Sequence, residues 1–125
     1  MIYYSTTVTA IGEEVPDLLD GGVLILYADG APAALAEVSV QHRVSGEVTS
    51  TAPPVGAQLT IGALSARVSA VGATAWNKVR ELGHVVLNFN GAGQAERPGE
   101  ICVERLDLMA MREQVRAGNR ISITD

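Results

Sequence analysis

Two histidines, His42 and His84, are the side chains of this sequence best suited to chemistry near neutral pH. An imidazole with an unperturbed pKa of about 6.5 stays largely neutral in a cell. Its unprotonated nitrogen can then attack a phosphoryl group. Other chemistries lack their residues, because the chain has one cysteine, no Walker-type or dinucleotide-binding glycine pattern, and no spacing typical of metal ligands. We therefore expect no metal site, and a small metal-dependent enzyme is the weakest of the interpretations considered.

His42 lies within Val38–Val44, where apolar and polar residues alternate as in a half-buried strand. The alternation places it on one face with Val38, Val40 and Val44. Two roles fit this position: a half-buried histidine that hydrogen-bonds to the backbone, or a nucleophile held in one orientation by a rigid strand. Arg43 is adjacent but should point to the opposite face, so its position alone does not make it a phosphate ligand.

His84 follows Gly83 at the expected end of a short helix over 74–82. One role for it is to satisfy the last carbonyl groups of that helix. The other is to act as a partner of His42, either orienting it or hydrogen-bonding its phosphate. Asn77 lies on the same helix and is a candidate hydrogen-bonding residue near the site, whereas Trp76 is expected to be a core residue.

The elements that must position these residues are mostly strands, because segments rich in β-branched residues with a period of two dominate the chain. Thr74 and Gly83 are the expected caps of the helix over 74–82, and further helical turns fit 13–20 and 108–116. We see no internal repeat and expect one domain over 1–125. The pattern predicts a mostly all-β, largely antiparallel barrel or sandwich of about eight short strands with one or two short helices. The expected strands are 2–11, 23–27, 35–44, 48–51, 59–61, 63–71, 84–89, 100–105 and 120–124.

The net charge, the cysteine content and the hydropathy of the chain limit the kinds of partner and the cellular compartment that we expect. A formal net charge of -5 disfavours nucleic acid as a partner. An acidic surface suits a basic protein partner, although such a charge more often serves only solubility. The single cysteine, Cys102, is expected to be a buried, inward-facing strand residue, and it fits a reducing cytoplasm. The N-terminus lacks the pattern of a signal peptide, and the longest apolar run, Val23–Tyr27, is too short to span a bilayer. We expect a soluble chain that does not insert into a membrane.

Several blocks, in order and at consistent distances, resemble the glucitol/sorbitol-specific IIA components of the sugar phosphotransferase system. The strongest is Asn77–Val85, with the sequence Asn-Lys-Val-Arg-Glu-Leu-Gly-His-Val. His42 falls where that family has its phosphorylated histidine. The other blocks are Thr6–Gly12, Asp29–Glu37, Pro54–Gly56, Val68–Gly72, Asn88–Gly91 and Ala95–Gly99.

The resemblance implies a closed β-barrel and a cytoplasmic phosphotransferase component that needs no metal or organic cofactor. HPr, the histidine-carrier protein, would phosphorylate His42, and the group would pass to a cysteine of the IIB component and then to sugar entering through the membrane component IIC. His84 would orient His42 or stabilise its phosphate, with Asn77 and Arg43 in support. This function predicts that His42 is accessible at one end of the barrel and that His84 lies close by.

The sequence departs from the family pattern just after His42. Val44 stands where the family can have a second histidine, and Ser45 is an insertion before Gly46. The alternative function is a non-catalytic β-barrel module for binding or regulation, derived from that family. It predicts that His42 is buried as a packing residue, so the exposure of this imidazole distinguishes the two functions.

Overall fold

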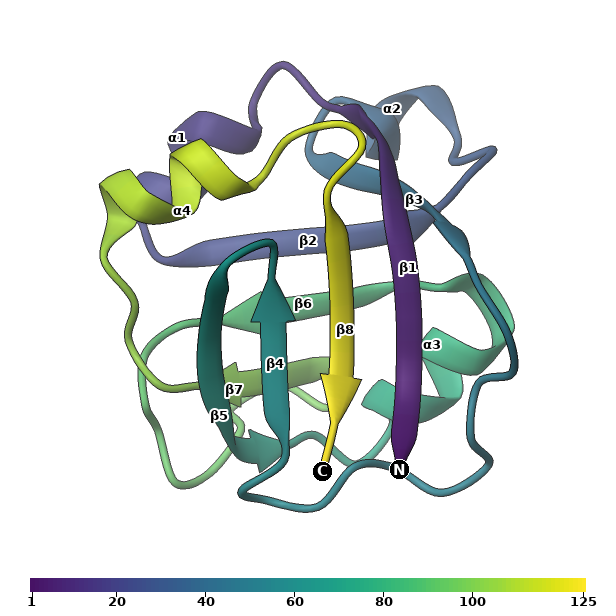
Figure 1. Ribbon diagram of the computed structural model, residues 1–125, viewed down its shortest axis with the longest axis vertical. Coiled ribbons are helices and arrows are strands. Elements are labelled where there is room, and N and C mark those ends of the chain that lie inside the picture. Colours follow the sequence, from purple (N-terminus) through teal and green to yellow (C-terminus); the bar gives the residue numbers. More distant parts are fainter.

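Eight strands close into a barrel in the order β1-β3-β2-β6-β7-β5-β4-β8 in a computed structural model that describes residues 1–125 (Figure 1). The strands are β1 (Ile2–Ile11), β2 (Val23–Ala28), β3 (Ser39–Val44), β4 (Gln58–Ile61), β5 (Leu64–Val71), β6 (Val85–Asn88), β7 (Glu100–Val103) and β8 (Arg120–Thr124). The helices are α1 (Val15–Asp20), α2 (Ala33–Ala36), α3 (Ala75–Leu82) and α4 (Leu108–Gln114).

The predicted fold class is confirmed: the chain is mostly β, and the barrel is closed and largely antiparallel. Six of the eight strand pairings are antiparallel, and only β2·β3 and β6·β7 are parallel. The prediction of one or two helices is wrong, since there are four. The strand expected over 35–44 begins only at Ser39, because Pro32 starts the short helix α2. The strand expected over 48–51 is absent.

The core fills the interior of the barrel with side chains from alternate strand positions. On β1, the inward positions Tyr4, Thr6 and Val8 are all buried. Cys102 is buried as predicted, but its expected inward direction is wrong. Its neighbours Ile101 and Val103 belong to the core cluster, whereas the Cys102 thiol bonds to the Glu100 carboxylate on the outer face. The alternation of a strand explains this, since only one of its two faces can point into a barrel.

The barrel consists of two similar halves, so the expectation of no internal repeat is wrong. The His42 half contains β8, β1, α1, β2 and β3, and the Val103 half contains β4, β5, α3, β6 and β7. Val8 pairs with His42, and Val68 pairs with Val103; each ladder has a register shift directly after that pair. The repeat is visible in the sequence as Ser-Thr-Thr-Val-Thr-Ala-Ile-Gly at 5–12 and Ser-Ala-Arg-Val-Ser-Ala-Val-Gly at 65–72.

Equivalent strand pairings extend this relation around the barrel. Tyr4 pairs with Ile123 in the His42 half, as Leu64 pairs with Ile61 in the Val103 half. The halves are joined by the β2·β6 and β4·β8 ladders. The paired strand positions of one half therefore have counterparts in the other. None of the four helices is long and apolar enough to cross a membrane.

Candidate functional site

His42 lies on β3 inside the barrel and has no exposed surface. Its Nε2 is 2.6 Å from the hydroxyl oxygen of Tyr4, and its Nδ1 is 3.5 Å from the carbonyl oxygen of Val40. The exposure predicted for a phosphoryl carrier is not observed in this conformation. The polar contact that defines the site is instead the short hydrogen bond between His42 and Tyr4.

Tyr4 is fixed on several sides. Its ring packs edge-on against the imidazole of His42 and against Trp76, with ring centroids 5.6 and 6.2 Å apart. Trp76 is itself anchored, because its indole N–H donates to the carbonyl oxygen of Thr49 at 2.7 Å. Gly83 lies against the Tyr4 hydroxyl, and a Cβ at that position would be 2.9 Å from it. The hydroxyl is therefore held in place by buried protein groups.

Burial sets the protonation states of this pair. It lowers the pKa of His42 from its ordinary value, against smaller raising effects from the Val40 carbonyl and the Asp29 carboxylate. Burial also raises the pKa of the Tyr4 phenol. Both groups are consequently neutral at physiological pH, as expected for ionisable groups removed from water. The neutral imidazole of His42 carries one N–H proton, and the neutral phenol of Tyr4 carries one O–H proton.

His84 is half-buried and lies on the outside of the barrel, just before β6. Its ring packs against Tyr27 on β2 with centroids 4.9 Å apart. Burial, followed by the nearby Lys78 ammonium, lowers its pKa. No hydrogen bond joins it to His42. The two histidines are linked indirectly, since Gly83, the residue before His84, packs against the hydroxyl that binds His42.

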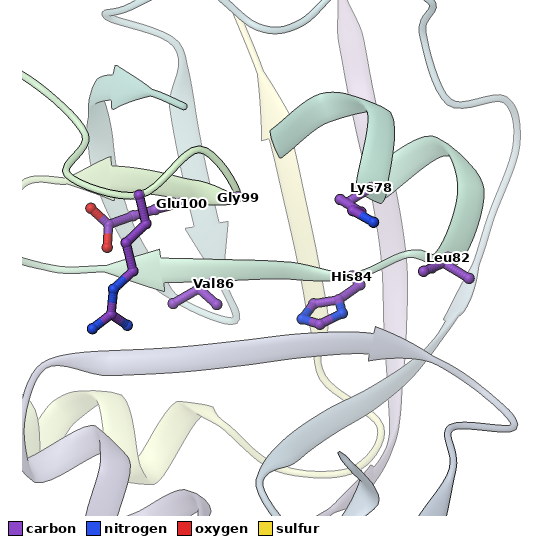
Figure 2. A pocket seen from close by; sticks show the side chains of 7 residues that line it. Lys78, Leu82, His84, Val86, Gly99 and Glu100 are labelled. Carbon is purple, nitrogen blue, oxygen red and sulfur yellow. The ribbon is translucent and has the colours of Figure 1, made fainter. Parts of the chain in front are cut away.

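A cavity of about 290 Å³ opens beside His84. It is lined by Lys78, Leu82, His84, Val86, Arg97, Gly99 and Glu100. Figure 2 shows Lys78 and His84 toward one end of the cavity and the carboxylate of Glu100 toward the other, with Val86 between them. Neither Lys78 nor Arg97 forms a salt bridge within the chain. The cavity therefore contains two cationic groups without a salt-bridge partner, and one of them, Lys78, lies close enough to His84 to affect its pKa.

The side chains of Arg43 and Asn77, the two residues expected to support His42, point away from it or lie elsewhere on the surface. Arg43 is exposed on the opposite strand face, as predicted. Asn77 is exposed on α3 and lines a separate surface depression with Val48, Arg80 and Glu81. Cys102 is not a reactive thiol, because burial and then the Glu100 carboxylate raise its pKa to about 11. Neither the Arg43 side chain nor the Asn77 side chain forms a hydrogen bond with the His42 ring.

Tyr4 was missed in the sequence interpretation, although it is the direct partner of His42. The available signal was the alternation of β1, which places Tyr4, Thr6 and Val8 on one face. That signal identifies an inward-facing tyrosine but not its partner. The partner follows from the neighbouring positions of β1 and β3 in the closed barrel, which no local pattern encodes.

Comparisons with known proteins agree on one family. Residues 3–122 match the family model described as the PTS system glucitol/sorbitol-specific IIA component. Proteins named as the PTS system glucitol/sorbitol-specific EIIA component from Shigella flexneri and from Escherichia coli K12 are each 41% identical over 102 residues, which span 82% of this chain and 81% of theirs.

A solved structure confirms the fold. The chain is similar to the crystal structure of a PTS system IIA component from Enterococcus faecalis V583, with a TM-score of 0.75 and 19% sequence identity. The similarity covers 97% of this chain and 99% of that one. The match of the family model to almost the whole sequence, and the identity to the two curated relatives, go beyond a shared fold. The chain therefore belongs to the family of glucitol/sorbitol-specific IIA components of the sugar phosphotransferase system.

Proposed function

We propose that this protein is a cytoplasmic phosphoryl carrier for the uptake of a glucitol- or sorbitol-type sugar, with His42 as the phosphoryl acceptor. Membership of the IIA family carries the proposal. A IIA component works with other components of the phosphotransferase system; here HPr is the donor, and a cysteine of the IIB component is the acceptor. His42 is the residue of this chain that resembles the phosphorylated histidine of the family.

The chemistry needs a neutral imidazole, and the lowered pKa of His42 supports that state. A nitrogen lone pair of His42 forms a bond to phosphorus while the bond from phosphorus to the donor imidazole breaks. The electron pair of the broken bond returns to the donor nitrogen, and the proton already on the other nitrogen of His42 stays there. Such a transfer depends on positioning and on stabilisation of the phosphoryl charge.

The burial of His42 adds a requirement to this proposal. A donor protein cannot reach a ring with no exposed surface. Phosphoryl transfer thus needs a conformational step in which the bond to Tyr4 breaks and the ring is uncovered. The structure is the resting form in this proposal, and such gating steps are common before group transfer.

His84 is proposed to stabilise the phosphoryl group or the docked donor from outside the barrel. Its cavity supports this role, since the nearby Lys78 and Arg97 are free to interact with phosphoryl oxygens. The role does not require contact between the two imidazoles in the resting form.

A second function is favoured by one observation: the complete burial of His42 is what a non-catalytic module derived from this family predicts. In that function the barrel would bind a partner without accepting a phosphoryl group. The two functions differ in a measurable covalent product.

The test is phosphorylation with radiolabelled phosphoenolpyruvate, enzyme I and HPr. Wild type should acquire acid-labile phosphate, His42→Gln should acquire none, and His84→Gln should be labelled more slowly. Labelling of His42→Gln at the wild-type rate, with loss of label in His84→Gln, would make His84 the acceptor. An unlabelled wild type with a cognate HPr would favour the non-catalytic module.

A further inference from the structure

The two halves of the barrel carry residues of different polarity at the positions of Tyr4 and His42. By strand register, His42 corresponds to Val103, and Tyr4 corresponds to Leu64. Val103 is fully buried, and Leu64 is partly buried against the core. The same backbone arrangement is thus closed with apolar residues in one half and with a hydrogen-bonded polar pair in the other.

The fold itself does not explain this polar pair. Burying a phenol hydroxyl and an imidazole removes both from water, and a hydrogen bond between them restores only part of that cost. Apolar side chains of suitable size carry no such cost, and the Val103 half shows that this barrel accepts them. A polar pair kept inside the core therefore points to a use beyond packing.

The contacts of the two ring nitrogens favour one tautomer of His42. If Tyr4 donates its O–H to Nε2, the proton on Nδ1 faces the carbonyl oxygen of Val40, and both protons have acceptors. If Nε2–H instead donated to Tyr4, the Tyr4 hydroxyl proton would have no acceptor, because His42 is its only hydrogen-bond partner. The bare Nδ1 would also face an oxygen lone pair. The first arrangement is favoured because buried donors rarely remain unpaired.

We propose that Tyr4 is the positioning residue of the site: its hydroxyl donates to Nε2 of His42 and holds the neutral ring as the Nδ1–H tautomer inside the barrel. This inference rests on the proposed function of His42. The tautomer matters because it leaves the lone pair on Nε2, the nitrogen that faces away from the strand backbone. A hydrogen-bond partner commonly sets the tautomer of a functional histidine in this way.

The same hydroxyl has a place in the transfer step. The conformational step that uncovers the ring breaks the hydrogen bond from Tyr4 to Nε2. When Nε2 then bonds to phosphorus and the donor's N–P bond breaks, the Nδ1 proton stays on His42. The Tyr4 O–H is then free to donate to an oxygen of the phosphoryl group. Tyr4 thus exchanges one acceptor for another, and its position is maintained by Trp76.

The test compares Tyr4→Phe with Tyr3→Phe. Tyr3 is the matched control, because its ring also packs against Trp76 while its hydroxyl bonds to Asp125 instead of His42. Nitrogen-15 spectra of the imidazoles report the tautomer without any phosphoryl transfer. In wild type, His42 should show a protonated Nδ1 and an unprotonated Nε2 that accepts a hydrogen bond. Tyr4→Phe should shift the Nε2 resonance toward that of a nitrogen without a donor, because the hydroxyl that bonds to it is removed. This variant should also accept phosphoryl groups about tenfold more slowly, the effect of one hydrogen bond. Tyr3→Phe should change neither.

A protonated Nε2 in wild type, or an unchanged Nε2 resonance in Tyr4→Phe, would overturn the inference. If wild type accepts no phosphoryl group, the proposed function fails, whereas the spectra still test the role of Tyr4. A double variant, Tyr4→Leu with His42→Val, copies the residues of the Val103 half and should fold cooperatively without accepting phosphate. Failure of this double variant to fold would show that the pair is needed for packing and would also overturn the inference.

Discussion

The neutral state of His42 inside the barrel links the stability of the protein to pH. Burial lowers the pKa of His42 below the ordinary value of 6.5 that it regains on unfolding. As the pH falls through about 6.5, the unfolded chain therefore binds a proton before the folded chain does. Protonation favours the unfolded state in this window, so the free energy of unfolding decreases as the pH decreases. His84 acts with the same sign, because its pKa is also lowered.

We predict that His42→Gln reduces this pH dependence between about pH 7.5 and pH 5, where one histidine can contribute at most about 1.4 kcal/mol per pH unit. Glutamine keeps an acceptor for the Tyr4 hydroxyl but cannot be protonated. The measurement is urea unfolding at a series of pH values, with His84→Gln as the control that retains the contribution of His42. Parallel curves for His42→Gln and wild type would contradict the prediction.

At the scale of single residues, the sequence predicts which face of a strand the His42 and Arg43 side chains occupy, but not which distant residues they contact. The alternation of Val38–Val44 correctly places His42 and Arg43 on opposite faces, because this depends only on strand geometry. It does not predict the bond to Tyr4, which joins residues 38 positions apart. It also gives no measure of how completely other strands cover the ring. The roles of His42 and His84 in phosphoryl transfer remain predictions.

The turn between α3 and β6 connects the candidate site to a backbone constraint. Gly83 caps α3 with a φ of +62°, a conformation that costs a residue with a Cβ about 1–2 kcal/mol. A Cβ there would also lie 2.7 Å from Cβ of Ala28 and 2.9 Å from the Tyr4 hydroxyl. The glycine therefore serves both the end of the helix and the close approach to Tyr4.

Gly83→Ala should consequently destabilise the protein more than Gly91→Ala does. Gly91 is the matched control, because its φ is +66° and a Cβ there would meet nothing within 4 Å. Gly91→Ala should lower the free energy of unfolding only by the cost of the left-handed backbone conformation. Gly83→Ala should lower it by about 1–3 kcal/mol more, because the added Cβ overpacks the core. Urea unfolding measures both, and the His42 imidazole spectrum should change in Gly83→Ala alone. Equal destabilisation by the two variants would show that contact with Tyr4 and Ala28 is unimportant.

At the scale of elements, the sequence predicts those that local signals define. The strand over Ile2–Ile11 and the glycine cap after Leu82 are both confirmed. The strand expected at 48–51 is wrong because Thr49 makes long-range bonds instead: its N–H donates to the Tyr3 carbonyl, and its own carbonyl accepts from Trp76. Tertiary contacts outweigh a short β-branched pattern of this kind.

The whole barrel should unfold as one unit, although it contains two similar halves. Neither half is a separate layer, because β2 of one pairs with β6 of the other, and β8 pairs with β4. The core is one cluster that includes residues of both halves. Trp76 from the Val103 half packs against Tyr3 and Tyr4 of the His42 half. A local loss of structure in one half thus exposes the core of the other.

This interleaving predicts that Trp76 fluorescence and far-ultraviolet circular dichroism report a single, coincident unfolding transition. Ile123→Ala on β8 tests it, because Ile123 is 3% exposed and pairs with both Tyr4 and Leu59. The variant should lose about 2–5 kcal/mol of stability and shift both signals together. The neighbouring Ser122→Ala should stay within about 0.5 kcal/mol of wild type. If only the fluorescence transition moved in Ile123→Ala, the two halves would unfold independently. The Val103 half would then be an autonomous folding unit.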